Sequence, residues 1–146
     1  MLKNYNGKDL FVLGMRGSPV DLQDLDYLEA AEQQLSRGGS VLALITNNAQ
    51  EEALKGKVVI DEADRLRLFR AFSVVGGALA SKSVDVVDGV PDFGRDLEHI
   101  RTFNPDSKIY FWNSEVTGSQ LPELPEMRVC EDLGIYVVNL ANPVTD

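Results

Sequence analysis

Cysteine is nearly absent from this sequence, in which Cys130 is the only one among 146 residues. A single cysteine excludes an internal disulfide and favours a reducing compartment. Long apolar runs are also missing, because no stretch reaches the roughly 18 residues of a membrane helix. The opening segment MLKNYNGKDL has no apolar core of the signal-peptide kind. We therefore expect a soluble, cytoplasmic protein that does not enter a membrane.

Positive charge is scarce as well. The chain has 14 Lys and Arg against 23 Asp and Glu, which gives a net charge of −9. Nucleic-acid surfaces depend on clustered Lys and Arg that contact phosphates, so this balance argues against nucleic acid as a partner. With 44% hydrophobic residues, the chain has the size and composition of one globular domain over residues 1–146. Small ligands or protein partners suit this acidic charge balance better than nucleic acid does.

The segment from Leu10 to Ala31 has the pattern of a strand, a loop and a helix. An apolar run ends at Gly14, and Ser18-Pro19 predicts a helix start with Pro in the first turn. Apolar residues at three- and four-residue steps then predict one buried helix stripe: Leu22, Leu25, Leu28, Ala31 and Leu35. In an open α/β sheet, ligands bind where such a loop leaves a strand. The loop from Gly14 to Asp24 is therefore the first candidate site.

The rest of the chain alternates strands with helices. Further strands are predicted at 40–46, 83–88, 108–112 and 135–139, and helices at about 61–72, 94–102 and 126–133. The polar segment 47–57 is long for a connection and can hold a short helix, and residues 121–125 form a Pro-rich connector. This alternation predicts an α/β fold, a Rossmann-like five-stranded parallel sheet with helices on both faces.

Several short motifs occur in an order that resembles a known superfamily. They are Tyr27-Leu28-Glu29-Ala30-Ala31, Ile45-Thr46-Asn47-Asn48, Lys55-Gly56, Asp64-Arg65, Asn104-Pro105-Asp106 and Gly134-Ile135-Tyr136-Val137. Over about residues 10–140 the chain resembles the cytidylyltransferase-like nucleotidyltransferases, nearest to the heptose 1-phosphate adenylyltransferase and glycerol-3-phosphate cytidylyltransferase branch. The resemblance implies a nucleotidyltransferase-type fold, a homodimer, and Mg²⁺-dependent transfer from CTP or ATP to a phosphorylated sugar or polyol.

The catalytic motif of that superfamily is altered. Its GxFD element falls on residues 15–18 and its HxGH element on Asp21-Leu22-Gln23-Asp24, so aspartates replace both histidines. Two carboxylates facing a triphosphate would repel it by roughly 4 kcal/mol for each close charge pair. A Mg²⁺ ion bridging Asp21 and Asp24 to phosphate oxygens would remove that repulsion. Alternatively, Ser18 and Asp21 form a capping box and the aspartates face the positive helix end.

Seven residues are candidates for nucleotide binding: Gly14, Arg16, Gly17, Ser18, Asn48, Lys55 and Arg65. Lys55 and Arg65 match the positions of a phosphate-contacting lysine and arginine in the superfamily, while Arg16 is a basic residue of the loop itself. Each basic side chain is alternatively a solvated surface charge, and the asparagines at 47–48 are alternatively turn residues.

The remaining chemistry-bearing residues have simple structural interpretations. Tyr110, Phe111 and Trp112 either stack a base, fill its pocket or pack in the core as strand residues. His99 suits a helix surface or the edge of the core, and Cys130 suits a small buried position. No late STT-type helix start is recognisable near Asp146.

Two functions follow from these observations. The first is a divergent nucleotidyltransferase-like protein with lost or altered catalysis that binds a nucleotide, a sugar phosphate or a protein partner. The second is an active Mg²⁺-dependent nucleotidyltransferase in which Asp21 and Asp24 hold the metal. A third, an interaction domain with an occluded site, requires the aromatic residues of 110–112 to fill the pocket.

Overall fold

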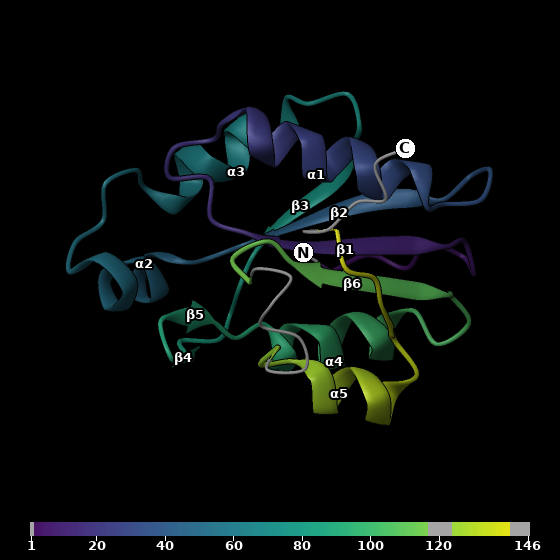
Figure 1. The fold of residues 1–146 in the computed structure, drawn as a ribbon. Coiled ribbons are helices and arrows are strands. Elements are labelled where there is room, and N and C mark those ends of the chain that lie inside the picture. The colour runs from purple at the N-terminus through teal and green to yellow at the C-terminus, as the bar shows by residue number, and fades with distance from the viewer. Residues whose placement is uncertain (1, 117–123, 141–146) are drawn as a thin grey trace.

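The computed structural model describes residues 2–116 and 124–140. Its centre is a parallel sheet with the strand order β3-β2-β1-β6-β7 (Figure 1). The strands are β1 (Leu10–Met15), β2 (Ser40–Ile45), β3 (Val75–Ala80), β6 (Ile109–Asn113) and β7 (Tyr136–Val137). Every residue of β1 is buried, as expected for the middle strand of a sheet covered on both faces. The five-stranded parallel sheet expected from the sequence is confirmed.

Helices cover both faces of this sheet. They are α1 (Leu22–Gln33), α2 (Asn48–Lys55), α3 (Glu62–Arg70), α4 (Gly94–Phe103) and α5 (Met127–Leu133). Figure 1 shows α1 and α3 above the sheet, α4 and α5 below it, and α2 at one end. None of the helices in the described part of the chain is both long and apolar enough to cross a membrane.

One predicted strand was wrong. The third strand of the sheet is Val75–Ala80, whose register places Ala78 beside Ala43 and Leu79 beside Leu44 of β2. Its sequence VGGALA is rich in Gly and Ala, which have low strand propensity, so only pairing with the buried β2 makes it a strand. The segment predicted instead, 83–88, contributes β4 (Val86–Val87) to a separate antiparallel hairpin with β5 (Val90–Pro91). Asp88 and Gly89 both have positive φ, the geometry of a tight hairpin turn.

The predicted start of the first helix was also wrong. The Ser18-Pro19 peptide bond is cis and helix α1 begins only at Leu22. Asp21 is the N-cap, with its side chain accepting a hydrogen bond from the backbone N–H of Asp24, so the capping box lies one turn later than expected. Leu22 consequently points outward with 79% exposure, and the buried positions of the helix are Leu28 and Ala31.

The end of β1 lies two residues beyond the apolar run that predicted it. Gly14 belongs to the strand because it pairs with Leu44 of β2 and Asn113 of β6, and a Cβ there would lie 2.5 Å from the Phe93 ring. Only a glycine permits this approach between the strand and the segment before α4. The loop that follows is correspondingly short, and its Gly17 has a positive φ of 65° against the ring of Phe69.

The other boundaries agree with the sequence. Asp61 caps the start of α3, Asn104 is the C-cap of α4, and Gly134 is the C-cap of α5 with a left-handed φ of 66°. The polar segment 47–57 does contain a short helix, α2. Strand β7 is shorter than the predicted 135–139, and of the Pro-rich connector only residues 124 and 125 lie within the described chain.

Candidate functional site

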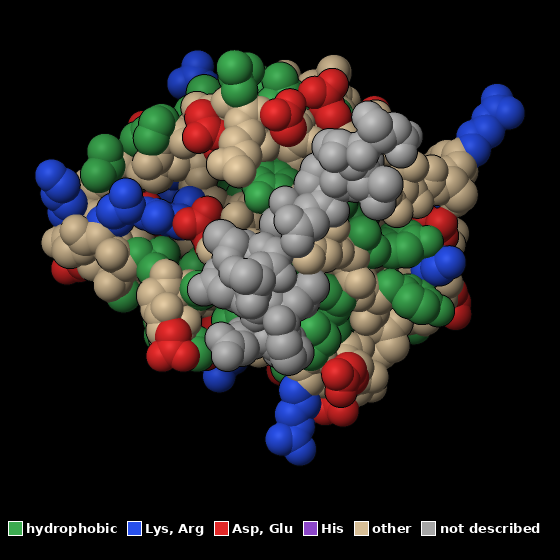
Figure 2. All heavy atoms as spheres, in the orientation of Figure 1, with side chains coloured by type: hydrophobic (Ala, Val, Ile, Leu, Met, Phe, Trp, Pro, Cys, Tyr) green, Lys and Arg blue, Asp and Glu red, His purple; other side chains and the backbone are tan. Residues whose placement is uncertain are grey.

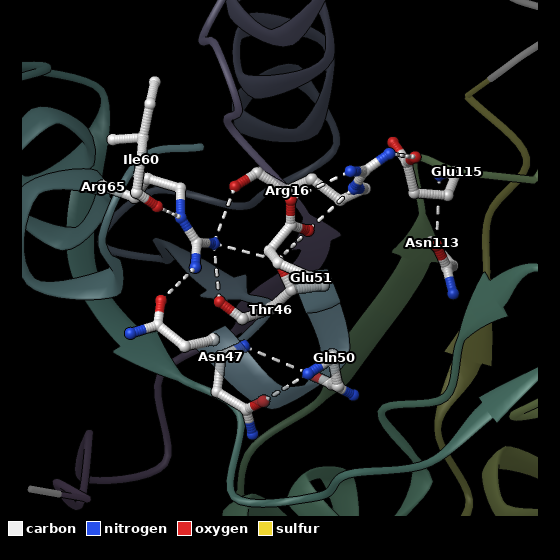
Figure 3. Close-up of polar contacts among 10 residues, drawn as sticks. Arg16, Thr46, Asn47, Gln50, Glu51, Ile60, Arg65, Asn113 and Glu115 are labelled. Carbon is white, nitrogen blue, oxygen red and sulfur yellow. Dashed lines mark hydrogen bonds and ion pairs between the residues drawn. The ribbon is translucent and has the colours of Figure 1, made fainter. Parts of the chain in front are cut away.

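The loops after β1, β2 and β6 meet at one edge of the sheet. The parallel register places Met15 beside Ile45 and Gly14 beside Asn113. The residues that follow these strand ends therefore converge, as the carboxyl edge of an open α/β sheet requires. Figure 3 shows the resulting cluster, in which polar side chains from the three loops and from α2 and α3 contact one another. We call Arg16, Thr46, Glu51, Arg65 and Glu115 the loop-edge cluster.

Arg16 is engaged by two carboxylates. Its Nε and Nη2 donate to the two oxygens of Glu51 at 2.8 and 2.9 Å, a bidentate pair, and Nη1 lies 3.5 Å from Glu115. Burial of Glu51 opposes its ionisation, but the hydrogen bonds from Arg16 and from the Thr46 hydroxyl outweigh it and lower the Glu51 pKa. Hydrogen bonding to Glu51 likewise raises the pKa of Arg16. The loop cation is therefore neutralised from within the protein.

Arg65 is fully buried and bound to the backbone. Its Nη1 donates to the carbonyl of Arg16 at 3.0 Å and to the carbonyl and hydroxyl of Thr46, while Nε donates to the carbonyl of Ile60. Its Nη2 lies 3.4 Å from the side-chain oxygen of Asn48. Burial is the main reason that the pKa of Arg65 is lowered. The side chain lies at the candidate loop, where its donors hold three chain segments together.

Asn48 connects the starts of two helices. Its backbone N–H donates to the Glu62 side chain, its Oδ1 accepts from the backbone of Glu62, and its Nδ2 donates to Asp61. Asn47 caps α2 and also donates to the carbonyls of Ser81 and Ser83. Both asparagines therefore make structural hydrogen bonds.

Lys55 differs from the two arginines. It is exposed in the last turn of α2 and makes no hydrogen bond or ion pair with the described residues. Its positive charge nevertheless acts on Glu115, whose pKa is raised mainly by burial and is lowered in part by Arg16 and Lys55. Lys55 is thus an exposed cation near the loop-edge cluster, and its ammonium group is open to an external ligand.

Asp21 and Asp24 cap α1 reciprocally. The Asp24 backbone N–H donates to Asp21 at 3.0 Å and the Asp21 backbone N–H donates to Asp24 at 3.1 Å. Burial raises the pKa of Asp24 to about 6, helped by the negative charges of Asp21 and Glu115. The two aspartates and Glu115 give this side of the loop a negative character, and acidic side chains also gather over α1 in Figure 2.

A metal at this place has few ligands to draw on. Within residues 2–116 and 124–140, no group of three or more His, Cys, Asp or Glu side chains is arranged to share an ion. Asp21 and Asp24 each already accept one backbone hydrogen bond. Water and substrate oxygens would have to supply the rest of the roughly six ligands that Mg²⁺ requires.

Sequence reasoning missed three acidic residues of this edge, Glu51, Glu115 and Glu126. Glu126 is fully buried, with one carboxyl oxygen accepting from the Phe93 backbone at 2.8 Å and from Asn113 at 3.0 Å. Its other oxygen, Oε1, has no partner among the described residues. Burial raises the Glu126 pKa to about 8. Glutamates are ordinary residues of helix starts and loops, so nothing in the sequence marked them.

The aromatic and sulfur-bearing residues are structural. Phe111 and Trp112 are buried, and Tyr110 stacks on Phe11 with ring centroids 5.8 Å apart, which confirms their interpretation as core residues of β6. Cys130 is buried as expected, and burial raises the pKa of its thiol to about 12. His99 is exposed on α4, away from the loop in sequence.

Comparisons with known proteins support the fold and leave the function open. No family model matches the sequence, and no curated protein matches it. The crystal structure of the lipopolysaccharide core biosynthesis protein from Thermoplasma volcanium GSS1 is similar, with a TM-score of 0.57 and 16% identity. The match covers 88% of this chain and 91% of that one. At this identity the likeness shows a shared Rossmann-like α/β fold.

Proposed function

We propose that this chain is a divergent nucleotidyltransferase-like protein that has lost nucleotidyl transfer and acts as a binding module. The observation that carries the proposal is the engagement of Arg16 and Arg65 inside the loop-edge cluster. Transfer from a nucleoside triphosphate depends on cations and donors aimed at the charge that develops on the reacting phosphate. Here those groups are already bound to carboxylate and carbonyl oxygens.

The surrounding charge supports the same conclusion. Asp21 and Asp24 stand where the resembled superfamily has its two histidines, and Glu115 lies close enough to raise the pKa of Asp24. A triphosphate placed there would meet carboxylates where the superfamily provides hydrogen-bond donors. The ligand that suits this edge is accordingly a smaller phosphate ester reached by Lys55, or a basic segment of a protein partner.

One observation favours the alternative of an active Mg²⁺-dependent transferase. Lys55 remains without a partner among the described residues, at the position that the superfamily uses for a phosphate contact. In that alternative Asp21 and Asp24 would bind the metal, and CTP or ATP would react with a phosphorylated sugar or polyol. The two functions differ in whether a nucleotide binds in the presence of Mg²⁺, and in whether that binding requires the carboxylates of Asp21 and Asp24.

The test is a calorimetric titration with CTP and with ATP, each with and without Mg²⁺. We expect no heat of nucleotide binding under any of these conditions. The informative variant is Asp21→Ser/Asp24→Gln, which removes both carboxylates but keeps a capping box of the Ser-x-x-Gln type. Glu29→Ala/Glu32→Ala on the exposed face of α1 is the control for the loss of two negative charges.

Mg²⁺-dependent binding that disappears in Asp21→Ser/Asp24→Gln and persists in the control would overturn the proposal and establish the transferase. Titration with glycerol 3-phosphate and with a hexose 1-phosphate then examines the smaller esters, and Lys55→Met should abolish any binding of them. The homodimer implied by the resemblance stays a prediction, which light scattering after size-exclusion chromatography measures directly.

A further inference from the structure

A pocket lies away from the loop-edge cluster, between β3 and α4. It has a volume of about 350 Å³, which is within the range of small-molecule sites. Its walls are mostly apolar, with Leu44 of β2, Leu79 and Ala80 of β3, and Ile100 and Phe103 of α4. We call it the α4 pocket. An apolar cavity of this size on a charged protein is a feature that a ligand can fill.

A neighbouring pocket lies along the same part of the sheet. This smaller pocket of about 180 Å³ shares Leu2, Leu79 and Ile100 with the α4 pocket and extends to Leu42 and Gly77. Leu2, from the segment before β1, lines both volumes. The two pockets therefore adjoin along these shared residues and together extend over β3 and α4, which suits a linear chain better than a compact ring.

Two nitrogen-bearing side chains line the α4 pocket but not the smaller pocket. Lys82 and His99 both line the α4 pocket and are both exposed. In a chain with a net charge of −9, Lys82 provides a permanent positive charge beside an apolar cavity, and His99 adds an imidazole. Neither side chain forms an ion pair with the described residues, whereas Arg16 does. Their donors are free for an external anion.

The backbone that carries Lys82 is held in place. Asp96, buried on α4, accepts the Lys82 backbone N–H at 2.9 Å and the Ser81 hydroxyl at 2.5 Å. Asn47 fixes the same segment from the other side through the carbonyls of Ser81 and Ser83. Asp96 is the one carboxylate among the described residues that line the pocket, and each of its oxygens thus accepts a hydrogen bond. Because this backbone is already held in place before a ligand arrives, ligand binding costs less conformational entropy.

We propose that the α4 pocket binds a linear monocarboxylate, with its carboxylate at Lys82 and His99 and its alkyl chain along Leu79 and Ile100. A single negative charge matches Lys82, the one Lys or Arg among the described residues that line the α4 pocket, whereas Lys3 and Arg70 line the smaller pocket. A doubly charged phosphate ester would leave one charge unpaired close to Asp96, and a cation would face Lys82. The apolar walls supply affinity in proportion to the alkyl surface that they cover.

The test uses octanoate as the probe and amide proton–nitrogen correlation spectra of the whole chain as the readout. We expect millimolar octanoate to shift the amides of residues 79–83 and 96–103. Octanol, of the same chain length without charge, should bind about tenfold more weakly, and octylamine more weakly still. Lys82→Met should lower octanoate affinity to that of octanol and leave octanol binding unchanged.

Two further variants test whether octanoate binds specifically in the α4 pocket. Lys57→Met removes an exposed lysine outside the pocket and should leave octanoate binding unchanged. Ala80→Leu fills the cavity and should abolish binding of both octanoate and octanol. The proposal is overturned if octanoate shifts none of these amides, if octylamine binds as well as octanoate, or if Lys82→Met has no effect. Shifts of the same amides with protein concentration alone would assign the pocket to a second copy and also overturn it.

Discussion

Arg65 binds the loop after β1 through its backbone, with Nη1 of Arg65 lying 3.0 Å from the carbonyl oxygen of Arg16. The same nitrogen donates to the carbonyl of Thr46 at 2.6 Å. One guanidinium therefore ties the ends of β1 and β2 to helix α3. This buried arginine therefore holds the chain's own loops together.

Replacing Arg65 should destabilise the fold strongly. Arg65→Met keeps much of the buried apolar stem but leaves the carbonyls of Arg16, Thr46 and Ile60 without their donor. Each such loss costs about 1–3 kcal/mol when the oxygen stays buried, so we expect a loss of at least roughly 3 kcal/mol for the three carbonyls. Urea denaturation followed by circular dichroism measures it. Arg67→Met, an exposed neighbour on α3, is the control and should change stability by less than about 0.5 kcal/mol.

We expect the side chains of Arg16 and Glu51 to be energetically coupled in folding. Arg16→Met should cost about 2–4 kcal/mol, because Glu51 is left charged and buried without its bidentate partner. Glu51→Gln in the Arg16→Met background should recover part of that loss, since a neutral amide can still accept from Thr46. A double-mutant cycle by chemical denaturation gives the coupling free energy. Simple additivity of the two substitutions would contradict a direct interaction.

Glu126 should make stability fall as pH rises. Its folded pKa of about 8 lies above the ordinary value of 4.5, so the folded state binds the proton more tightly than the unfolded state. The stabilisation is complete below about pH 4.5 and is lost up to about pH 8, with a slope of up to about 1.4 kcal/mol per pH unit. Glu126→Gln keeps an acceptor for Phe93 and Asn113 and should remove this slope.

The measurement for Glu126 is a series of thermal or urea unfolding curves between pH 4.5 and 9. Glu131→Gln, exposed on the same helix α5, is the control for removing one carboxylate. Parallel pH profiles of wild type and Glu126→Gln would show that the buried carboxyl does not titrate in this range.

Gly14 should tolerate no side chain while Phe93 is present. A Cβ at Gly14 would lie 2.5 and 2.6 Å from two atoms of the Phe93 ring, so Gly14→Ala should destabilise by about 1–3 kcal/mol through overpacking. Phe93→Leu removes those ring atoms. The double variant Gly14→Ala/Phe93→Leu should therefore cost less than the sum of its parts, as unfolding midpoints will show. Equal costs in both backgrounds would rule out the contact.

Strong local patterns allowed much of the fold to be predicted from sequence. The continuous apolar runs of β1 and β2, Asp61 before α3 and Gly134 after α5 each carried a signal that the structure confirms. Strand β3 had no such signal, because VGGALA becomes a strand only by pairing with β2. The start of α1 was misjudged because Ser18-Pro19 is a typical helix opening in isolation, whereas the chain places its cap at Asp21.

The candidate site, like the fold, could be predicted from the sequence only in part. The sequence by itself determined that Arg16 and Asn48 follow strands, and the family resemblance added Arg65, which lies on α3. Only the tertiary structure decided what they contact, because Glu51 and Glu115 come from α2 and from the loop after β6. A side chain's charge is encoded in its residue type, but its neutralisation depends on distances between segments far apart in the chain. That is the physical reason why the sequence pointed to this edge of the sheet, whereas the fold decided which contacts its side chains make.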